Sequence, residues 1–384
     1  MKIRRLCLAA LFILALISIS FYGGVVSYVF FYAVISIPLI SLAYLLYVLL
    51  RFAVYQRIRT RNIIACEPVP YSLRLTNEGR AVFTSVAVKL HADYSSVEGI
   101  FDNQSFTLFP AERNVIETML TCKYRGEYPV GVERLIVTDF LGIFRLNYRM
   151  PSGIEAIVRP RIRDLSNAND SPELAQFLQS HLSPEQNETD ILIRDYMPGD
   201  SLKKIHWKQT AKSGALKVRT DVGQVKQKVL LMADFERVSS KMDVYLPLEN
   251  QILEQAIALL YYFVRQNVPT EFLFLAEAVE KRPVHGIHQF NLLYEELALL
   301  HFREGRPFGS LYHGAADQGV LSAAPLIFAV INKLDDGLYE AFLRSAKAGK
   351  IIIVYVAGDF DAAAYARKES DRLKIVGIGS QGGK

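Results

Sequence analysis

Leu6–Tyr22 reads LCLAALFILALISISFY, and Val25–Leu50 reads VVSYVFFYAVISIPLISLAYLLYVLL. Neither run contains a charged residue, and only Gly23 and Gly24 separate them. An α-helix needs about 20 apolar residues to cross the hydrocarbon core of a bilayer, so the runs predict two membrane-spanning helices. The glycine pair predicts a tight turn between them. We therefore expect a transmembrane helix hairpin over residues 1–62, with spans at about 6–22 and 25–50.

Positive charges flank this hairpin on both sides. They are Lys2, Arg4 and Arg5 before the first span, and Arg51, Arg57, Arg59 and Arg61 after the second. The turn carries no charge, so the positive-inside rule predicts a multi-pass protein of the cell membrane with both termini and the soluble domains in the cytoplasm. A cleaved signal peptide is an alternative, but no small-x-small site follows the first run. A buried soluble hairpin is disfavoured because no charged residue interrupts either run.

Length and composition bound the rest of the chain. Its 384 residues exceed one ordinary hydrophobic core, so two soluble domains are expected beside the anchor. Apolar residues make up 51% of the sequence, and the excess lies in the predicted spans. Cys7, Cys66 and Cys122 have neither metal-ligand nor redox spacing, which agrees with a reducing compartment.

Residues 66–160 alternate apolar and polar side chains in short runs. The runs are Tyr71–Leu75, Val82–Leu90, Ser105–Phe109, Val115–Cys122 and Leu135–Thr138. Turn-forming residues separate them at intervals of about ten residues, a spacing typical of an all-β sandwich. Such a β-sandwich domain serves equally well as a spacer or as a binding module.

Residues 161–225 form a signature segment that links the two soluble domains. Its pattern predicts a strand over Ile191–Tyr196, a short helix capped by Asp200 or Ser201 that ends near Gly214, and a strand over Leu216–Val222. From residue 194 to residue 228 there are nine Lys or Arg against three Asp. The candidate binding residues of this segment are Arg194, Tyr196, Gly199, Asp200, His206, Trp207, Lys208 and Gly214.

The basic segment has several interpretations. A solvated helix face is the simplest, and a docking surface for an acidic partner or for anionic lipid headgroups is the functional alternative. Nucleic-acid binding is disfavoured because Trp207 stands alone, without other stacking aromatics. His206 and Asp200 together suggest a hydrolase, but no Ser or Cys in a nucleophile elbow accompanies them, and a lone His beside a Trp is more often a packed residue.

Residues 226–384 alternate apolar strands with helices. The strands are Lys228–Ala233, Glu271–Ala276, Pro325–Ile331, Lys350–Val356 and Leu373–Ile378, and the helices are Leu248–Gln266, Gln289–Phe302 and Asp335–Ala348. Uniformly apolar strands between helices predict a parallel sheet covered on both faces. The fold class is therefore a membrane-anchored α+β multidomain chain: a helix hairpin, a β-sandwich and an α/β parallel-sheet domain.

Two motifs carry a resemblance to a known family. Arg194–Arg219 resembles the signature of the domain of unknown function 58 family, and Tyr124–Gly131 with Asp139–Phe144 is similar to two further elements of it. The usual Pro after Asp139 is absent. The resemblance implies a von Willebrand factor A-like C-terminal domain. It also implies a partner, a MoxR-type AAA ATPase, often accompanied by transglutaminase-like membrane proteins.

Such A domains often hold Mg²⁺ through Asp-x-Ser-x-Ser after the first strand, using the hard oxygen ligands that this ion requires. Here Asp234 is the one retained candidate, because Glu236 and Val238 replace the two hydroxyls. We expect no metal site and no cofactor. The leading hypothesis is a non-enzymatic, membrane-tethered cytosolic scaffold or adaptor that docks a protein. A Mg²⁺-dependent ligand-binding module is the first alternative, and a hydrolase using His206 and Asp200 is the second.

Overall fold

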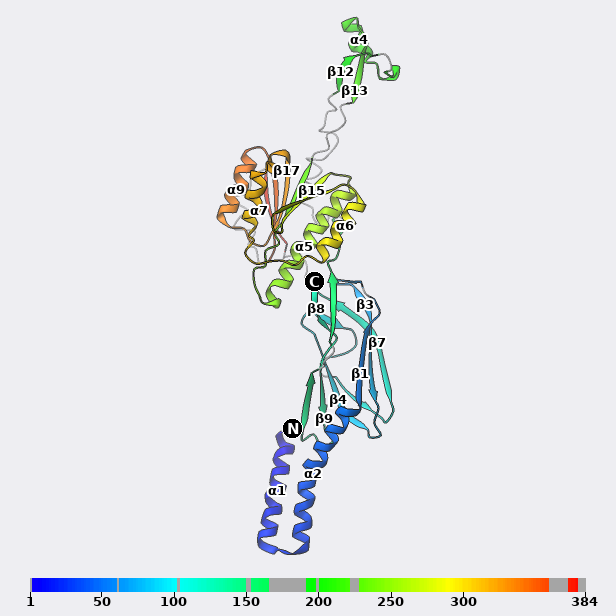
Figure 1. Ribbon diagram of the computed structural model, residues 1–384, viewed down its shortest axis with the longest axis vertical. Coiled ribbons are helices and arrows are strands. Elements are labelled where there is room, and N and C mark those ends of the chain that lie inside the picture. The colour runs from blue at the N-terminus through cyan, green and yellow to red at the C-terminus, as the bar shows by residue number, and fades with distance from the viewer. Residues whose placement is uncertain are drawn as a thin grey trace. The chain divides into compact units, whose positions relative to one another are not determined.

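The computed structural model describes residues 2–60, 62–101, 104–149, 153–165, 191–197, 200–221, 228–358 and 372–378. The chain divides into two compact units, Met1–Arg161 and Ile162–Lys384. The first unit contains the N-terminal helices and the antiparallel sheets, and the second contains the mostly parallel sheet with its helices (Figure 1).

The two apolar runs form α1 (Lys2–Tyr22) and α2 (Gly24–Arg51), which lie side by side as a hairpin (Figure 1). Both helices are long and apolar enough to cross a membrane. Gly23 and Gly24 have φ of 57° and 82°, a conformation that residues with a Cβ atom adopt with strain, so the turn requires glycine. Pro38 lies inside α2. Most side chains of α1 and half of those of α2 are exposed, as expected of a surface that faces lipid.

The last turns of α2 pack against the sheets of the first unit instead of standing free. Leu45 and Val48 are buried. The Tyr44 hydroxyl donates to the Val82 carbonyl at 2.8 Å, and the Tyr47 hydroxyl accepts from the Arg80 amide at 2.7 Å. The end of α2 is therefore part of the packed unit.

Three sheets make up the rest of the first unit. Their strand orders are β1-β3-β7-β5, β10-β9-β4-β6 and β2-β11-β8, antiparallel except for the β2–β11 pair. The strands are β1 (Phe52–Ile58), β2 (Ile63–Ile64), β3 (Pro68–Asn77), β4 (Phe83–Leu90), β5 (Ser95–Val97), β6 (Gln104–Leu108), β7 (Arg113–Cys122), β8 (Gly126–Val130), β9 (Val132–Thr138), β10 (Arg145–Arg149) and β11 (Ile154–Arg159). All five predicted runs overlap observed strands. The structure adds β1, β2, β5, β8, β10 and β11. Of these, β1 continues directly from α2 and pairs with β3.

The loop between β9 and β10 carries the Asp139–Phe144 motif. The Asp139 carboxylate accepts the Phe144 amide at 2.8 Å and also the hydroxyl of Ser41 in α2. Arg4 and Arg5 of α1 donate to the carbonyls of Leu141 and Ile143, at 3.0 and 2.7 Å. This loop therefore fastens the sheets to both helices of the hairpin. We name residues 139–144 the clamp loop.

A six-stranded sheet forms the centre of the second unit, in the order β16-β15-β14-β17-β18-β19. Its strands are β14 (Val229–Ala233), β15 (Thr270–Leu275), β16 (Val279–Val284), β17 (Leu326–Ile331), β18 (Ile351–Val356) and β19 (Leu373–Gly377); its helices are α5 (Met242–Arg265), α6 (Ile287–Ala298), α7 (Phe308–Asp317), α8 (Val320–Ala323) and α9 (Asp336–Lys347). All neighbouring strands are parallel except β15 and β16, which are antiparallel.

Helices cover both faces of this sheet, as predicted. Side chains of α5 and α6 pack with one set of strand residues, and side chains of α7, α8 and α9 pack with the other set. The alternation follows from the period of two along each strand: Leu231 belongs to the first cluster, and Leu230 and Met232 to the second. The sequence analysis omitted β16, α7 and α8, and α5 begins at Met242, six residues earlier than predicted.

Candidate docking site

The signature segment forms a small module of two strands and a helix. Strands β12 (Ile191–Asp195) and β13 (Lys217–Asp221) pair antiparallel, and the 3-10 turn η1 (Leu202–Lys204) and helix α4 (Trp207–Ser213) lie between them in sequence. We call described residues 191–197 and 200–221 the signature module. Both predicted strands are confirmed.

Asp200 closes the turn after β12. Arg194 donates two hydrogen bonds to its carboxylate, at 2.8 and 2.6 Å, and the Met197 amide donates a third at 2.9 Å. The bonds from Arg194 and Met197 hold the pKa of Asp200 below its ordinary value, because they stabilise the charged form. The carboxylate therefore fixes backbone geometry.

The predicted helix cap was wrong in position. Helix α4 begins at Trp207, and His206 caps it: its Nδ1 accepts the Gln209 amide at 3.2 Å. Asp200 and Ser201 do not cap α4, because the Asp200 carboxylate binds Arg194 and Met197 and η1 intervenes. The predicted end was correct: Gly214 follows the helix with φ of 68°, the left-handed conformation that glycine favours.

The module exposes large apolar side chains beside lysines. Trp207 and Leu202 are each 67% exposed, and Met197 is 63% exposed. The exposed lysines are Lys203, Lys204, Lys208 and Lys212. Exposed aromatic and aliphatic side chains ringed by charge are typical of a protein-docking surface. Sequence reasoning missed Leu202 and Met197, although two apolar residues in an otherwise polar turn were a usable signal.

The structure divides the predicted binding residues into two groups. Trp207 and Lys208 are exposed on α4, whereas Arg194, Asp200 and His206 hold the backbone of the module. Tyr196 is half-buried, and its amide donates to the Leu216 carbonyl at 2.9 Å. Gly214 ends the helix, as described above. Gly199 lies outside the described residues.

Asp234 follows β14 at the carboxyl edge of the second-unit sheet. Its two carboxylate oxygens accept the amides of Glu236 and Asn332, at 3.1 and 3.2 Å. Burial raises its pKa to about 6. The carboxylate thus connects the loops after β14 and β17. Within the described ranges, no group of three or more His, Cys, Asp or Glu side chains is arranged to hold a metal ion.

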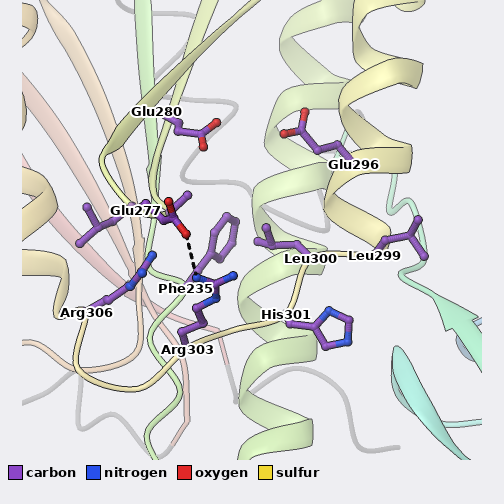
Figure 2. A pocket seen from close by; sticks show the side chains of 11 residues that line it. Phe235, Glu277, Glu280, Glu296, Leu299, Leu300, His301, Arg303 and Arg306 are labelled. Atoms are coloured by element: carbon purple, nitrogen blue, oxygen red, sulfur yellow. Dashed lines mark ion pairs between the residues drawn. The ribbon is translucent and has the colours of Figure 1, made fainter.

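A cleft of about 380 Å³ opens beside this edge (Figure 2). Glu277, Glu280 and Glu296 line it together with His301, Arg303 and Arg306. Arg303 pairs with Glu277 at 3.6 Å, and Arg282 pairs with both other glutamates. The lining carries both signs of charge and indicates no particular class of ligand.

The geometry describes a protein with an apolar helix hairpin, antiparallel sheets and a mixed α/β sheet. Residues 192–286 match the model of the family described as "Protein of unknown function DUF58". The chain thus contains a DUF58 family domain, as the resemblance predicted, and the Asp139–Phe144 motif lies outside the matched residues. No curated protein matches the chain.

The structural neighbours include von Willebrand factor A domains. The SpRpn10 VWA domain is 12% identical, and the match covers 40% of this chain and 88% of that one, with a TM-score of 0.29. A von Willebrand factor type A protein from Catenulispora acidiphila is 14% identical, with 42% and 39% covered and a TM-score of 0.28. Proximal thread matrix protein 1 from the mussel byssus is 10% identical, with 40% and 43% covered and a TM-score of 0.29.

This chain spans most of the first of these neighbours, but less than half of the other two. Such distant likenesses carry no argument about function. The fold assignment rests on the strand order and on the helices that cover both faces of the sheet.

Proposed function

We propose that this chain is a non-enzymatic, membrane-tethered adaptor whose signature module docks an acidic surface of a protein partner. The observation that carries the proposal is the 67% exposure of Trp207, the sole tryptophan, on a helix that also presents Lys208 and Lys212. Buried tryptophans are among the side chains that contribute most to binding free energy at interfaces. Lysines around such an anchor favour an acidic partner and accelerate encounter with it.

The exposed apolar surface of the signature module supports the same conclusion. Among its described side chains, Ile205 and Val218 are the buried apolar ones. An isolated two-stranded hairpin is marginally stable in water, because it has little apolar surface to bury. Covering Trp207, Leu202 and Met197 with a partner would bury further apolar surface and so stabilise the module.

Docking should therefore depend on both the anchor and the charge of α4. Full-length protein in detergent would be used to capture partners from a membrane-free extract, with Trp207→Ala and Lys208→Glu as test variants. Phe101→Ala and Lys241→Glu remove a comparably exposed aromatic and reverse a charge elsewhere. The proposal is supported if one captured protein is lost with both test variants and is retained with both controls. It is contradicted if the wild type and all four variants capture that protein equally.

The resemblance adds a finer hypothesis, that the partner is a MoxR-type AAA ATPase. It is tested by asking whether the protein lost with Trp207→Ala is an ATPase of that class. Raised salt should weaken the capture, because screening shortens the range of the lysine charges. Recovery of a partner without ATPase activity would leave the adaptor role in place and reject this identity.

Membrane anchoring with a cytoplasmic adaptor is the second part of the proposal. It is supported by the apolar hairpin, by arginines at both helix ends and by an uncharged turn. Cys66 is exposed in the first unit and provides a native probe. A membrane-impermeant maleimide should label Cys66 only after cells are permeabilised. Labelling in intact cells would show that the soluble units lie outside the cytoplasm.

No observation favours either alternative function. For a Mg²⁺ site, the Asp234 carboxylate already accepts two backbone amides. For a hydrolase, Asp200 is held by Arg194, and the His206 Nδ1 accepts a backbone amide. These side chains already hold the backbone through hydrogen bonds, so we favour the adaptor role over a metal site or a hydrolase.

A further inference from the structure

The clamp loop presents apolar side chains beside the hairpin. Phe140 is 47% exposed and Leu141 is 37% exposed, although both lie next to the buried Asp139. The Tyr44 ring meets Phe140 edge-on, with 5.3 Å between the ring centroids. Arg4 and Arg5 hold the backbone of the loop, and Ser41 holds the Asp139 side chain, so Phe140 and Leu141 project from a fixed support rather than from a free loop.

Helix geometry gives the height of this loop above the tip of the hairpin. Arg5 lies 17 residues from Tyr22 at the tip end of α1, and Ser41 lies 17 residues from Gly24 at the tip end of α2. At 1.5 Å per residue, each path is about 25 Å long. The hydrocarbon core of a bilayer is about 30 Å thick, so both helices place the clamp loop near its boundary.

The chemistry of the neighbouring residues fits this boundary. Arg4 and Arg5 are the last charged residues before the apolar run of α1, and Arg145 follows the clamp loop in an exposed position. Basic side chains near the membrane attract anionic headgroups, while aromatic rings settle at the interface. Beyond Ser41, α2 packs Leu45 and Val48 against the sheets, while Leu42 and Leu46 stay exposed on its other face.

We infer that the clamp loop is a membrane-contact surface, with Phe140 and Leu141 inserted among the headgroups and upper acyl chains of the bilayer that holds the hairpin. The sheets of the first unit are held against the membrane surface rather than on a free tether. This inference rests on the proposed membrane anchoring.

Tryptophan fluorescence with brominated lipids tests it on the full chain. The native Trp207 is first replaced by Trp207→Phe, which leaves a background without tryptophan. Three single probes follow: Phe140→Trp in the clamp loop, Phe31→Trp within α2, and Phe101→Trp as the distal control. Phe101 is a distal control because it lies near the end of β4 that is farther from α2. Gln104, three residues after Phe101, pairs with Val88 at that end, whereas Phe83 at the opposite end of β4 contacts Tyr47 of α2.

Each probe is reconstituted in bilayers whose acyl chains are brominated near the headgroup or near the terminal methyl. Phe140→Trp should lose emission with the shallow bromines, and Phe31→Trp should lose emission with the deep ones. Phe101→Trp should keep its emission with both. Leu141→Trp repeats the measurement should Phe140→Trp fail to fold.

Quenching of both the α2 and the clamp-loop probes supports the inference. A quenched Phe31→Trp with a clamp-loop probe as bright as Phe101→Trp would overturn the membrane contact and leave the anchor intact. An unquenched Phe31→Trp would overturn the membrane anchor itself, and the inference with it.

Discussion

The central sheet of the second unit and the signature module are both built around strands, but their described apolar side chains differ in how deeply they are buried. Every residue of β14 and β17 is buried, and helices pack on both faces. In the signature module, Ile205 and Val218 are buried while Trp207 is two-thirds exposed. The sheet is stable through its own packing, whereas the module depends on hydrogen bonds and on whatever covers its surface.

Removing a large side chain from the sheet should have the largest effect. Phe328 in β17 is fully buried and contacts Phe263 of α5. Phe328→Ala should lower the free energy of unfolding of the second unit by about 3–5 kcal/mol, because it leaves a cavity. Hydrogen-exchange mass spectrometry on the full chain in detergent would measure this change. Leu292→Ala, at a position 61% exposed, is the control, and its free energy of unfolding should stay within about 0.5 kcal/mol of the wild-type value. Similar losses of stability in both variants would contradict the idea that the sheet is stabilised by its own core.

The contributions of Asp234 and Asp200 to folding stability should depend on pH with opposite signs. The folded pKa of Asp234 is about 6, above the ordinary 3.8. Its contribution to stability is therefore fully present below pH 3.8 and is lost as pH rises through 6, a change of about 3 kcal/mol. Asp200 has a lowered pKa and should act oppositely, losing its contribution as pH falls through the folded pKa.

Exchange rates of amides in the second-unit sheet, measured between pH 4 and 7.5 and corrected for intrinsic exchange, would report the Asp234 effect. Asp234→Asn should flatten the dependence, and Asp317→Asn, at an exposed position, should leave it in place. A wild-type sheet that gains stability steadily from pH 4 to 7.5 would contradict this assignment.

Gly214 offers a smaller and local test of the signature module. Gly214→Ala should destabilise the end of α4 by about 1–2 kcal/mol, because the left-handed conformation strains a residue that carries a Cβ atom. Open space surrounds the position, so crowding adds nothing. Exchange of the α4 amides is the measurement. Gly309→Ala, which is also uncrowded but has an ordinary φ, should be neutral or slightly stabilising.

Trp207→Ala should have the smallest effect on stability, within about 0.5 kcal/mol, because the ring is exposed. Its effect on partner capture should be the largest of the series. Measuring α4 exchange and capture on the same preparation separates the two. A large loss of α4 protection would show that Trp207 packs within the module, and the contrast with the sheet would then disappear.

The sequence predicted the sheets well, because local periodicity determines them. The apolar run at Leu326–Ile331 and the alternation in Arg113–Cys122 both reflect burial that neighbouring residues share. Strand β16 was missed because Val279–Val284 is an edge strand with charged residues and Pro283, a composition that resembles a loop.

The candidate site was harder to predict because its contacts are specific. Whether Asp200 caps a helix or pairs with Arg194 depends on side-chain geometry that periodicity does not encode. The bond between Ser41 and Asp139 joins residues 98 positions apart, so no local pattern reveals it. The exposure of Trp207 likewise depends on which side chains pack around the ring, and the sequence pattern does not encode that packing.

The glycine turn between α1 and α2 has a consequence for signalling. With only Gly23 and Gly24 between the helices and no charged residue in either run, a hairpin inserted as proposed presents no charged side chain to the compartment opposite the soluble units. A charged messenger in that compartment would find no side chain of this hairpin with which to form an ion pair. Charged signals would then act on the soluble units, or on neighbouring proteins that contact the helices within the membrane.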